Sequence, residues 1–152
     1  MEQRVHFMTA ATRDLDRARH FYVDGLGWTP TLDVPDEILF FQVAPGVMLG
    51  LFEADAFAAD LANDLGSGSA VATAPGGFTL SHNVASVEEV DRVLGRAAEA
   101  GATIVKSGRR AAFGGYHGYF ADPNDLLWEV AFNPGWQVAE DGRVTLSPVE
   151  PE

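Results

Sequence analysis

Three side chains in the C-terminal half of the sequence could carry out acid–base chemistry together. His117, Tyr119 and Glu129 are residue types that enzymes use as general acids and bases. If the turn before Glu129 is a five-residue loop, 122–126, Tyr119 stands opposite Glu129 on an antiparallel hairpin. A two-residue loop would instead place the residues on either side of Tyr119 opposite Glu129. With the longer loop the three groups would form a hydrogen-bonded cluster. The same strand also fits an ordinary aromatic core strand.

The composition of the chain excludes several kinds of catalytic site and partner. The 152 residues include no cysteine, which excludes a cysteine nucleophile, a disulfide and a thiolate metal site. Hydrophobic residues make up 47% of the chain and charged residues 21%, as in a folded single domain. The formal charge of -12 disfavours nucleic acid and anionic membranes as partners and favours a cationic ligand. No apolar stretch suits a membrane span or a signal peptide, so we expect a cytoplasmic protein.

The elements that must position these groups occur twice in the same order. The first copy begins with an apolar strand at 5–11, followed by a helix with a polar start at Arg13-Asp14 and a stop at Gly25 and Gly27. The second copy has a strand at 78–84 and a helix that begins at Ser86, in a Ser-x-x-Glu capping box, and ends at Gly101. This repetition predicts two related units in one chain.

Three short strands follow each helix, separated by turn residues. They are expected at 28–34, 38–44 and 47–52 in the first copy and at 102–106, 116–121 and 126–132 in the second. Each copy is therefore a βαβββ unit, and the fold class is α+β. We expect a single domain over 1–133, made of modules 1–53 and 77–133 joined by the linker 54–76, and then a tail, 134–152, that forms a short hairpin or an arm on the surface.

Two segments of the sequence resemble the vicinal oxygen chelate superfamily, which includes glyoxalase I, bleomycin resistance proteins, fosfomycin resistance enzymes and extradiol dioxygenases. The first segment is 14–22 with Gly25-Leu26-Gly27-Trp28, and the second is 118–129. In the second, Asn124-Asp125 replaces the Asp-Gly that is usual in the family. The resemblance implies tandem modules whose mixed sheets curve around a small-molecule cavity, a homodimer, and a closing hairpin that pairs Tyr119 with Glu129.

Metal-dependent members of this superfamily usually hold a divalent cation with four inward side chains, two from each module. By the resemblance, these ligand positions fall on Phe7, Gly50, Thr79 and Glu129. Only Glu129 is a usual ligand type, so we expect no metal and no other cofactor. His6 and His82 lie an odd number of residues from ligand positions, and alternation turns them to the opposite face, where we expect backbone partners. A bulge in the first strand would turn His6 inward and restore one ligand.

Alternation along the strands also predicts the lining of the cavity. Thr9, Ser81 and Leu127 share a face with the ligand positions. The expected lining comprises Phe7, Thr9, Thr79, Ser81, Tyr119, Leu127 and Glu129. Because a carboxylate in such a cavity loses hydration, we expect the pKa of Glu129 to lie above its usual value of about 4.3.

Three functions fit these observations. The first is a metal-independent small-molecule-binding protein, similar to the bleomycin resistance branch, with an antibiotic or other cationic ligand. The second is an enzyme that uses Glu129 as acid or base, with His117 or Tyr119, for proton transfer next to a carbonyl. The third is a lyase, isomerase or dioxygenase with an atypical divalent metal site that includes Glu129. Because three of the four ligand positions lack a usual ligand type, the binding function is favoured. The sequence leaves open whether the protein is an enzyme.

Overall fold

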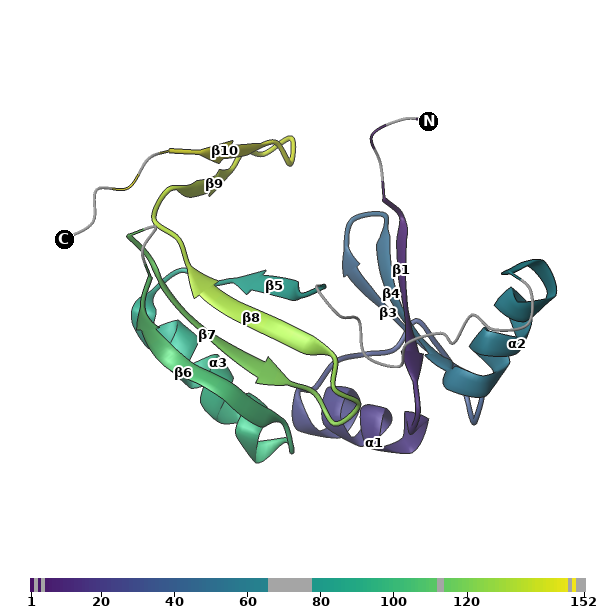
Figure 1. The fold of residues 1–152 in the computed structure, drawn as a ribbon. Helices are drawn as coiled ribbons and strands as arrows, with labels where there is room; N and C mark the ends of the chain where they lie inside the picture. Colours follow the sequence, from purple (N-terminus) through teal and green to yellow (C-terminus); the bar gives the residue numbers. More distant parts are fainter. Residues whose placement is uncertain (2, 4, 66–77, 112–113, 148, 150–152) are drawn as a thin grey trace.

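Two four-stranded sheets make up the body of the protein, and their strands follow the same order (Figure 1). The computed structural model describes residues 1, 3, 5–65, 78–111, 114–147 and 149. The strand order is β1-β4-β3-β2 in one sheet and β5-β8-β7-β6 in the other. In each sheet the unit's first and fourth strands run parallel, and the other neighbours are antiparallel. The repeated βαβββ unit and the α+β class with mixed sheets are therefore confirmed.

The first unit places one helical segment between its first two strands. Its elements are β1 (Phe7–Thr12), α1 (Leu15–Arg19), the π-helical turn η1 (His20–Gly25), β2 (Leu32–Val34), β3 (Ile38–Ala44) and β4 (Val47–Glu53). Asp14, in the polar start predicted at Arg13-Asp14, caps α1, because its carboxylate accepts a hydrogen bond from the N–H of Arg17 at 2.8 Å. β2 begins later than predicted, since Pro30 just before it has no N–H to offer the sheet.

The second unit repeats this arrangement with a longer helix. Its elements are β5 (Leu80–Asn83), α3 (Val87–Glu99), β6 (Thr103–Arg110), β7 (Tyr116–Ala121) and β8 (Leu127–Phe132). Ser86 caps α3 by accepting a hydrogen bond from the N–H of Glu89 at 3.2 Å. β6 is longer than predicted, because its pairing with β7 continues as far as Arg110 opposite Tyr116.

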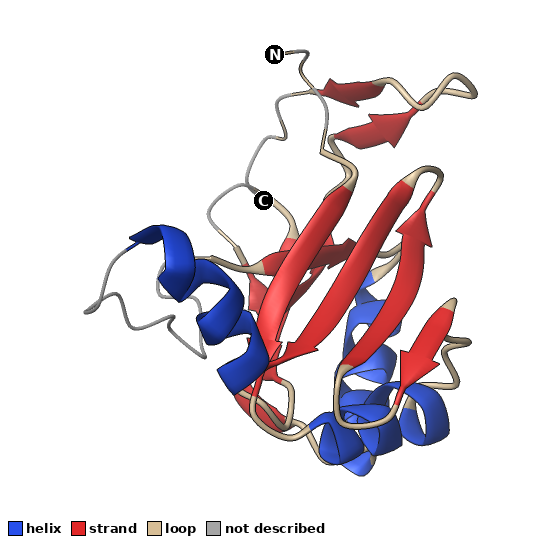
Figure 2. Cartoon of the chain, turned by 90° about the vertical axis from the view of Figure 1, so that its right-hand side faces the viewer, coloured by secondary structure: helices blue, strands red, loops and turns tan. Residues whose placement is uncertain are grey.

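Two further elements lie outside the repeated units. The linker forms the helix α2 (Ala54–Leu65), and the rest of the linker, 66–76, lies outside the described residues, as does residue 77. The tail forms the predicted hairpin from β9 (Trp136–Val138) and β10 (Val144–Leu146), which stands apart from the two sheets in Figures 1 and 2. In the described part of the chain, no helix is long and apolar enough to cross a membrane.

α1 and α3 each cover one face of a sheet, α2 packs on the other face of the first sheet through Phe57 and Phe52, and the two units share one hydrophobic core. Its buried members are Leu15, Ala18, Phe21, Tyr22, Leu39, Phe41, Leu49 and Leu51 from the first unit and Leu80, Val90, Leu94, Ala97, Phe120, Leu126, Trp128 and Val130 from the second. The faces turned away from α1 and α3 are called the open faces below. The open face of the first sheet faces the viewer in Figure 2, whereas that of the second faces the viewer in Figure 1. Within one chain, the two open faces therefore point in different directions.

A buried polar contact joins the two units. The hydroxyl of Tyr22 donates a hydrogen bond to Asp122 at 2.8 Å and accepts one from the indole N–H of Trp128 at 3.0 Å. All three side chains are almost fully buried. Because Tyr22 lies in η1, while Asp122 directly follows β7 and Trp128 lies in β8, these bonds fix the second sheet on the helix of the first unit.

Candidate functional site

The closing hairpin of the second sheet brings the predicted acid–base residues together. Asp122 accepts hydrogen bonds from the N–H groups of Asn124 and Leu126, both at 2.8 Å, and Asp125 adopts a left-handed conformation with φ of 69°. The loop is therefore the longer of the two predicted alternatives. The resulting register pairs Tyr119 with Glu129, as predicted.

Glu129 lies on the open face of the second sheet and receives three hydrogen bonds from side chains. Its neighbours Trp128 and Val130 are buried against α3, so alternation turns the carboxylate the other way. Its Oε1 atom lies 2.7 Å from Nδ1 of His117 and accepts a hydrogen bond from the hydroxyl of Tyr119 at 2.9 Å. Its Oε2 atom accepts one from the hydroxyl of Ser81 at 2.8 Å. The Glu129 side chain keeps 21% of its surface exposed.

A fifth residue, Lys106, extends this arrangement through the histidine. Its Nζ atom lies 2.5 Å from Nε2 of His117 and 5.3 Å from the centre of the Tyr119 ring. An ammonium group can only donate, so Nε2 is the acceptor and Nδ1 carries the hydrogen that points to Glu129. Lys106, His117, Glu129, Tyr119 and Ser81 are called the Glu129 cluster below.

The environment of the Glu129 carboxyl contradicts the pKa expected from the sequence. Burial raises its pKa, but hydrogen bonds from His117, Ser81 and Tyr119 stabilise the anion, and together they lower the pKa below the ordinary value. The pKa of Tyr119 is raised by burial, by its hydrogen bond to Glu129 and by the negative charge of that group. Glu129 is therefore held as a carboxylate at neutral pH, and the prediction of a raised pKa is wrong.

The three other ligand positions of the family offer no converging donors. Phe7 packs edge-on against Phe40, with ring centres 4.9 Å apart, and its ring occupies the space that a Cβ at position 50 would need. An acidic side chain in place of Gly50 would therefore meet the Phe7 ring. Across the described ranges, no three His, Cys, Asp or Glu side chains gather in a group that could hold a metal ion.

The two histidines next to ligand positions lie on the surface. His6 precedes β1 and His82 lies in β5, and both are exposed. Within the part of the chain that the structure describes, neither imidazole has a hydrogen-bond partner, so the backbone partners expected for them are not found. The register irregularity in the first sheet lies between Gln42 and Ala44 in β3, outside the first strand.

The predicted lining residues do not converge on one cavity within the chain. Phe7 and Thr9 lie on the open face of β1, while Tyr119, Leu127 and Glu129 lie on β7 and β8 of the second sheet. Thr79 and Ser81 instead line a cavity of about 810 Å³ between the two units. The open faces of the two sheets point in different directions, so the predicted lining residues lie in different parts of the chain.

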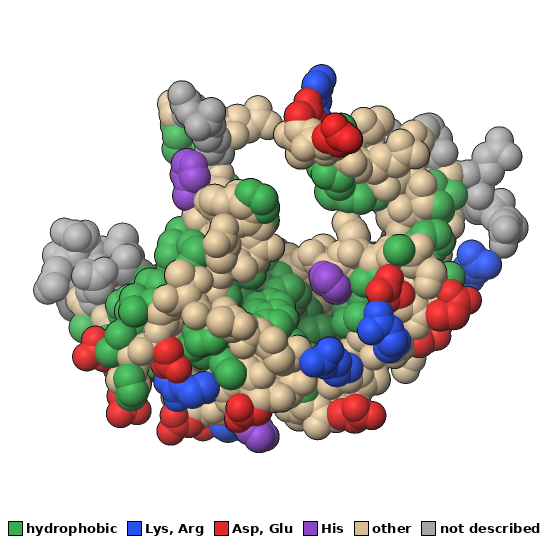
Figure 3. Space-filling model, turned by 180° about the vertical axis from the view of Figure 1, so that it is seen from behind, with side chains coloured by type: hydrophobic (Ala, Val, Ile, Leu, Met, Phe, Trp, Pro, Cys, Tyr) green, Lys and Arg blue, Asp and Glu red, His purple; other side chains and the backbone are tan. Residues whose placement is uncertain are grey.

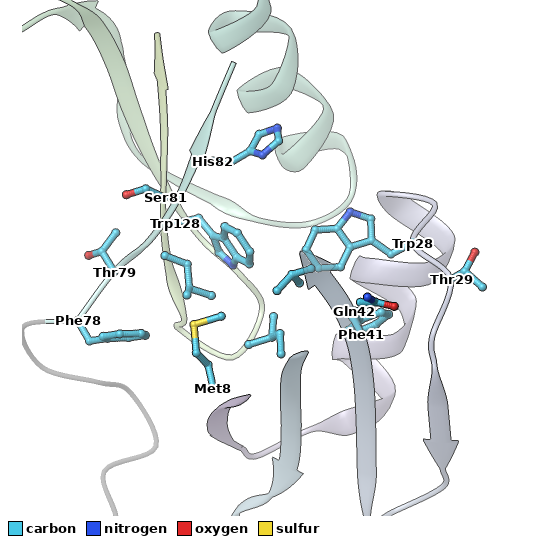
Figure 4. Close-up of a pocket in the computed structure, with 13 residues that line it drawn as sticks. Met8, Trp28, Thr29, Phe41, Gln42, Phe78, Thr79, Ser81, His82 and Trp128 are labelled. Atoms are coloured by element: carbon cyan, nitrogen blue, oxygen red, sulfur yellow. The ribbon is translucent and has the colours of Figure 1, made fainter. Parts of the chain in front are cut away.

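This cavity, called the seam cavity below, was not predicted from the sequence. Figure 3 shows hydrophobic side chains gathered in a hollow of the surface seen from behind, and Figure 4 shows the side chains around the cavity. Its apolar wall includes Met8, Trp28, Phe41, Leu49, Leu80 and Trp128. No sequence motif marks these positions as the wall of a cavity, because the cavity depends on how the two units pack.

Comparisons with known proteins agree with this architecture. The family profile of the Glyoxalase/Bleomycin resistance protein/Dioxygenase superfamily matches residues 4–130. No match was found among curated proteins. Among solved structures, a glyoxalase-related enzyme from Fulvimarina pelagi is 35% identical, with 96% of this chain and 99% of that chain covered and a TM-score of 0.83.

Two further solved structures are more distant. A lactoylglutathione lyase from Agrobacterium tumefaciens is 26% identical over 87% of this chain and 95% of its own, with a TM-score of 0.64. A glyoxalase/bleomycin resistance protein/dioxygenase from Nocardioides is 23% identical over 91% of each chain, with a TM-score of 0.67, and shows the fold alone. Since the profile spans most of the sequence and both sheets have the expected topology, the chain belongs to the Glyoxalase/Bleomycin resistance protein/Dioxygenase superfamily.

Proposed function

We propose that this protein binds a small molecule without a metal ion, and that the Glu129 carboxylate anchors the ligand. One observation carries the proposal: the carboxylate at the fourth ligand position is held by protein donors, while Phe7 fills the space beside Gly50. His117, Tyr119 and Ser81 thus hydrogen-bond the carboxylate oxygens that a metal ion would otherwise contact. No cofactor is part of the proposed function.

The unused capacity of Glu129 indicates what kind of ligand group would bind there. A carboxylate has about four acceptor sites, and the Glu129 cluster fills two on Oε1 and one on Oε2. Oε2 can therefore accept one more hydrogen bond from the open face. An ammonium group is the best partner, because the carboxylate is ionised and the net charge of -12 attracts cations to the protein.

The chain from Lys106 through His117 to Glu129 favours an acid–base enzyme as the second candidate. Such a chain could move a proton between the carboxylate and a substrate bound on the open face. The glyoxalase-related enzyme and the lactoylglutathione lyase among the similar structures are enzymes by their descriptions. However, the lowered pKa makes Glu129 a weak base at neutral pH, and this supports binding over proton abstraction.

Two probes that differ in charge test the proposal. Titration calorimetry with benzylamine and with benzoate should show binding of the amine only. Glu129→Gln should weaken benzylamine binding by about tenfold, the loss of one charge-assisted hydrogen bond. Glu99→Gln, which removes the same charge from an exposed position on α3, is the control and should leave the affinity unchanged.

The same variants separate the two candidate functions. If the purified protein transforms a member of a carbonyl substrate panel and Glu129→Gln abolishes the turnover, the enzyme is the correct function. Equal benzylamine affinity in the wild type and in Glu129→Gln would contradict Glu129 as the anchor in the binding function.

A further inference from the structure

The seam cavity lies on the other side of the second sheet from most of the Glu129 cluster. Trp128 and Leu80 contribute to it from the face that packs on α3, while Glu129 and Tyr119 point from the open face. The cavity and the cluster share only the edge strand β5, through Ser81, among the described residues. The cavity is therefore a separate space with its own chemistry.

Aromatic rings form much of the wall of the seam cavity. Trp28 lies edge-on to Trp128, with ring centres 5.8 Å apart, and edge-on to Phe41 at 5.3 Å. Trp128 and Phe41 are only 9% and 1% exposed, so they form a fixed wall, while Phe78 is 45% exposed at the mouth. In Figure 4 the rings of Trp28, Trp128 and Phe78 surround the same space. Such walls favour flat rings, which can stack or make edge contacts.

The cavity also lacks charge. None of the described residues that line it is Asp, Glu, Lys or Arg. Polar groups lie at its rim, where the side chains of Gln42 and His82 are exposed. The imidazole of His82 has no hydrogen-bond partner among the described residues. A charged ligand group would lose hydration in the interior without a compensating partner, whereas one polar group of a ligand could reach Gln42 or His82.

We propose that the seam cavity is a second ligand site, which binds a neutral molecule with fused or linked aromatic rings. The volume of about 810 Å³ lies within the range of about 300 to 1,000 Å³ that is usual for small-molecule sites. The rings contact Trp28, Trp128 and Phe41, and a polar edge of the ligand faces the rim. This site does not depend on the ligand proposed for Glu129.

Two fluorescent probes that differ only in a sulfonate group provide the test. N-phenyl-1-naphthylamine is neutral, and 1-anilinonaphthalene-8-sulfonate carries the same rings with a negative charge. The measurement is made at high salt, so that the net charge of the protein is screened. The neutral probe should saturate at one probe per chain and quench tryptophan emission. The sulfonate should bind at least about tenfold more weakly than the neutral probe.

A matched pair of variants locates the probe. Val43 lines the cavity and is 38% exposed, so Val43→Glu adds a charge to the wall without disturbing a buried position. Val105→Glu makes the same change on β6, at a residue that is 59% exposed and lies outside the cavity lining. Val43→Glu should weaken binding of the neutral probe by about tenfold, while Val105→Glu and Glu129→Gln should leave it unchanged.

Three results would overturn the proposal. The first is equal binding of the two probes, and the second is equal affinity of Val43→Glu and Val105→Glu for the neutral probe. The third is a dimer, seen by sedimentation, whose formation excludes the probe, because a second copy would then be the occupant. Loss of benzylamine binding in Glu129→Gln with unchanged binding of the neutral probe separates this site from the proposed function.

Discussion

Replacing Tyr22 by phenylalanine removes the polar contact that joins the two units. The Tyr22 side chain is fully buried, and its hydroxyl serves both Asp122 and Trp128. The lost hydrogen bond to a carboxylate accounts for about 1.5 to 3 kcal/mol, and the unpaired indole N–H costs about 1 to 3 kcal/mol more. Allowing for relaxation, we expect Tyr22→Phe to lower the free energy of unfolding by about 3 kcal/mol, measured by urea denaturation.

The cost of Tyr22→Phe should also depend on pH, through Asp122. Burial raises the pKa of Asp122, and the hydrogen bond from Tyr22 is one of the contacts that lower it again. Without the hydroxyl, the folded variant binds a proton more readily than the folded wild type. As the pH falls through these raised pKa values, the variant gains stability relative to the wild type, so the difference between them should shrink.

Tyr116→Phe is the control for this experiment. It also removes a tyrosine hydroxyl that donates to a carboxylate, that of Asp91, but this bond lies at the surface. Its cost should stay within about 0.5 kcal/mol. If Tyr22→Phe cost no more than Tyr116→Phe, or if its cost grew at acid pH, the buried contact between the units would not be what holds them together.

Three other substitutions test the site. Gly50→Ala should destabilise the protein by about 1 to 3 kcal/mol through overpacking against the Phe7 ring, and adding Phe7→Ala should restore part of this loss in the same denaturation assay. Glu129→Gln should lower stability at neutral pH by about 1 kcal/mol; because the folded pKa of Glu129 is depressed, this difference should be constant above the unfolded pKa and vanish as the pH falls through the folded one. Lys106→Met should leave the His117 imidazole with its hydrogen on Nδ1, visible in nitrogen NMR shifts, because the Glu129 carboxylate can only accept a hydrogen bond from that nitrogen, and a change to hydrogen on Nε2 would show that Glu129 does not hold the tautomer.

The repeated unit was predictable because each of its elements has a strong local signal. The polar start at Arg13-Asp14 and the capping box at Ser86 indicated the helix starts, and apolar runs between turn residues located most strands. The facing of Glu129 came from the resemblance, and alternation extended it to Ser81 and Leu127. The pairing of Tyr119 with Glu129 required the longer loop, and the resemblance, rather than the turn residues themselves, favoured that choice.

The rest depended on contacts between distant segments, which have no local signal. Lys106 lies where the pairing of β6 and β7 is irregular, so alternation could not place it beside His117. The raised pKa expected for Glu129 counted burial but not the three donors from two neighbouring strands. The seam cavity depends on how the two units pack, because its wall combines Trp28 of the first unit with Trp128 of the second.

The metal content of the purified protein tests the central claim most directly. We expect that elemental analysis after dialysis finds no stoichiometric zinc, nickel, manganese or iron, because Phe7, Gly50 and Thr79 supply no set of ligands to join Glu129. The measurement is made on the wild type and on Glu129→Ala, and both should give the same low value. A stoichiometric amount of one metal that survives dialysis in the wild type and disappears in Glu129→Ala would contradict the claim.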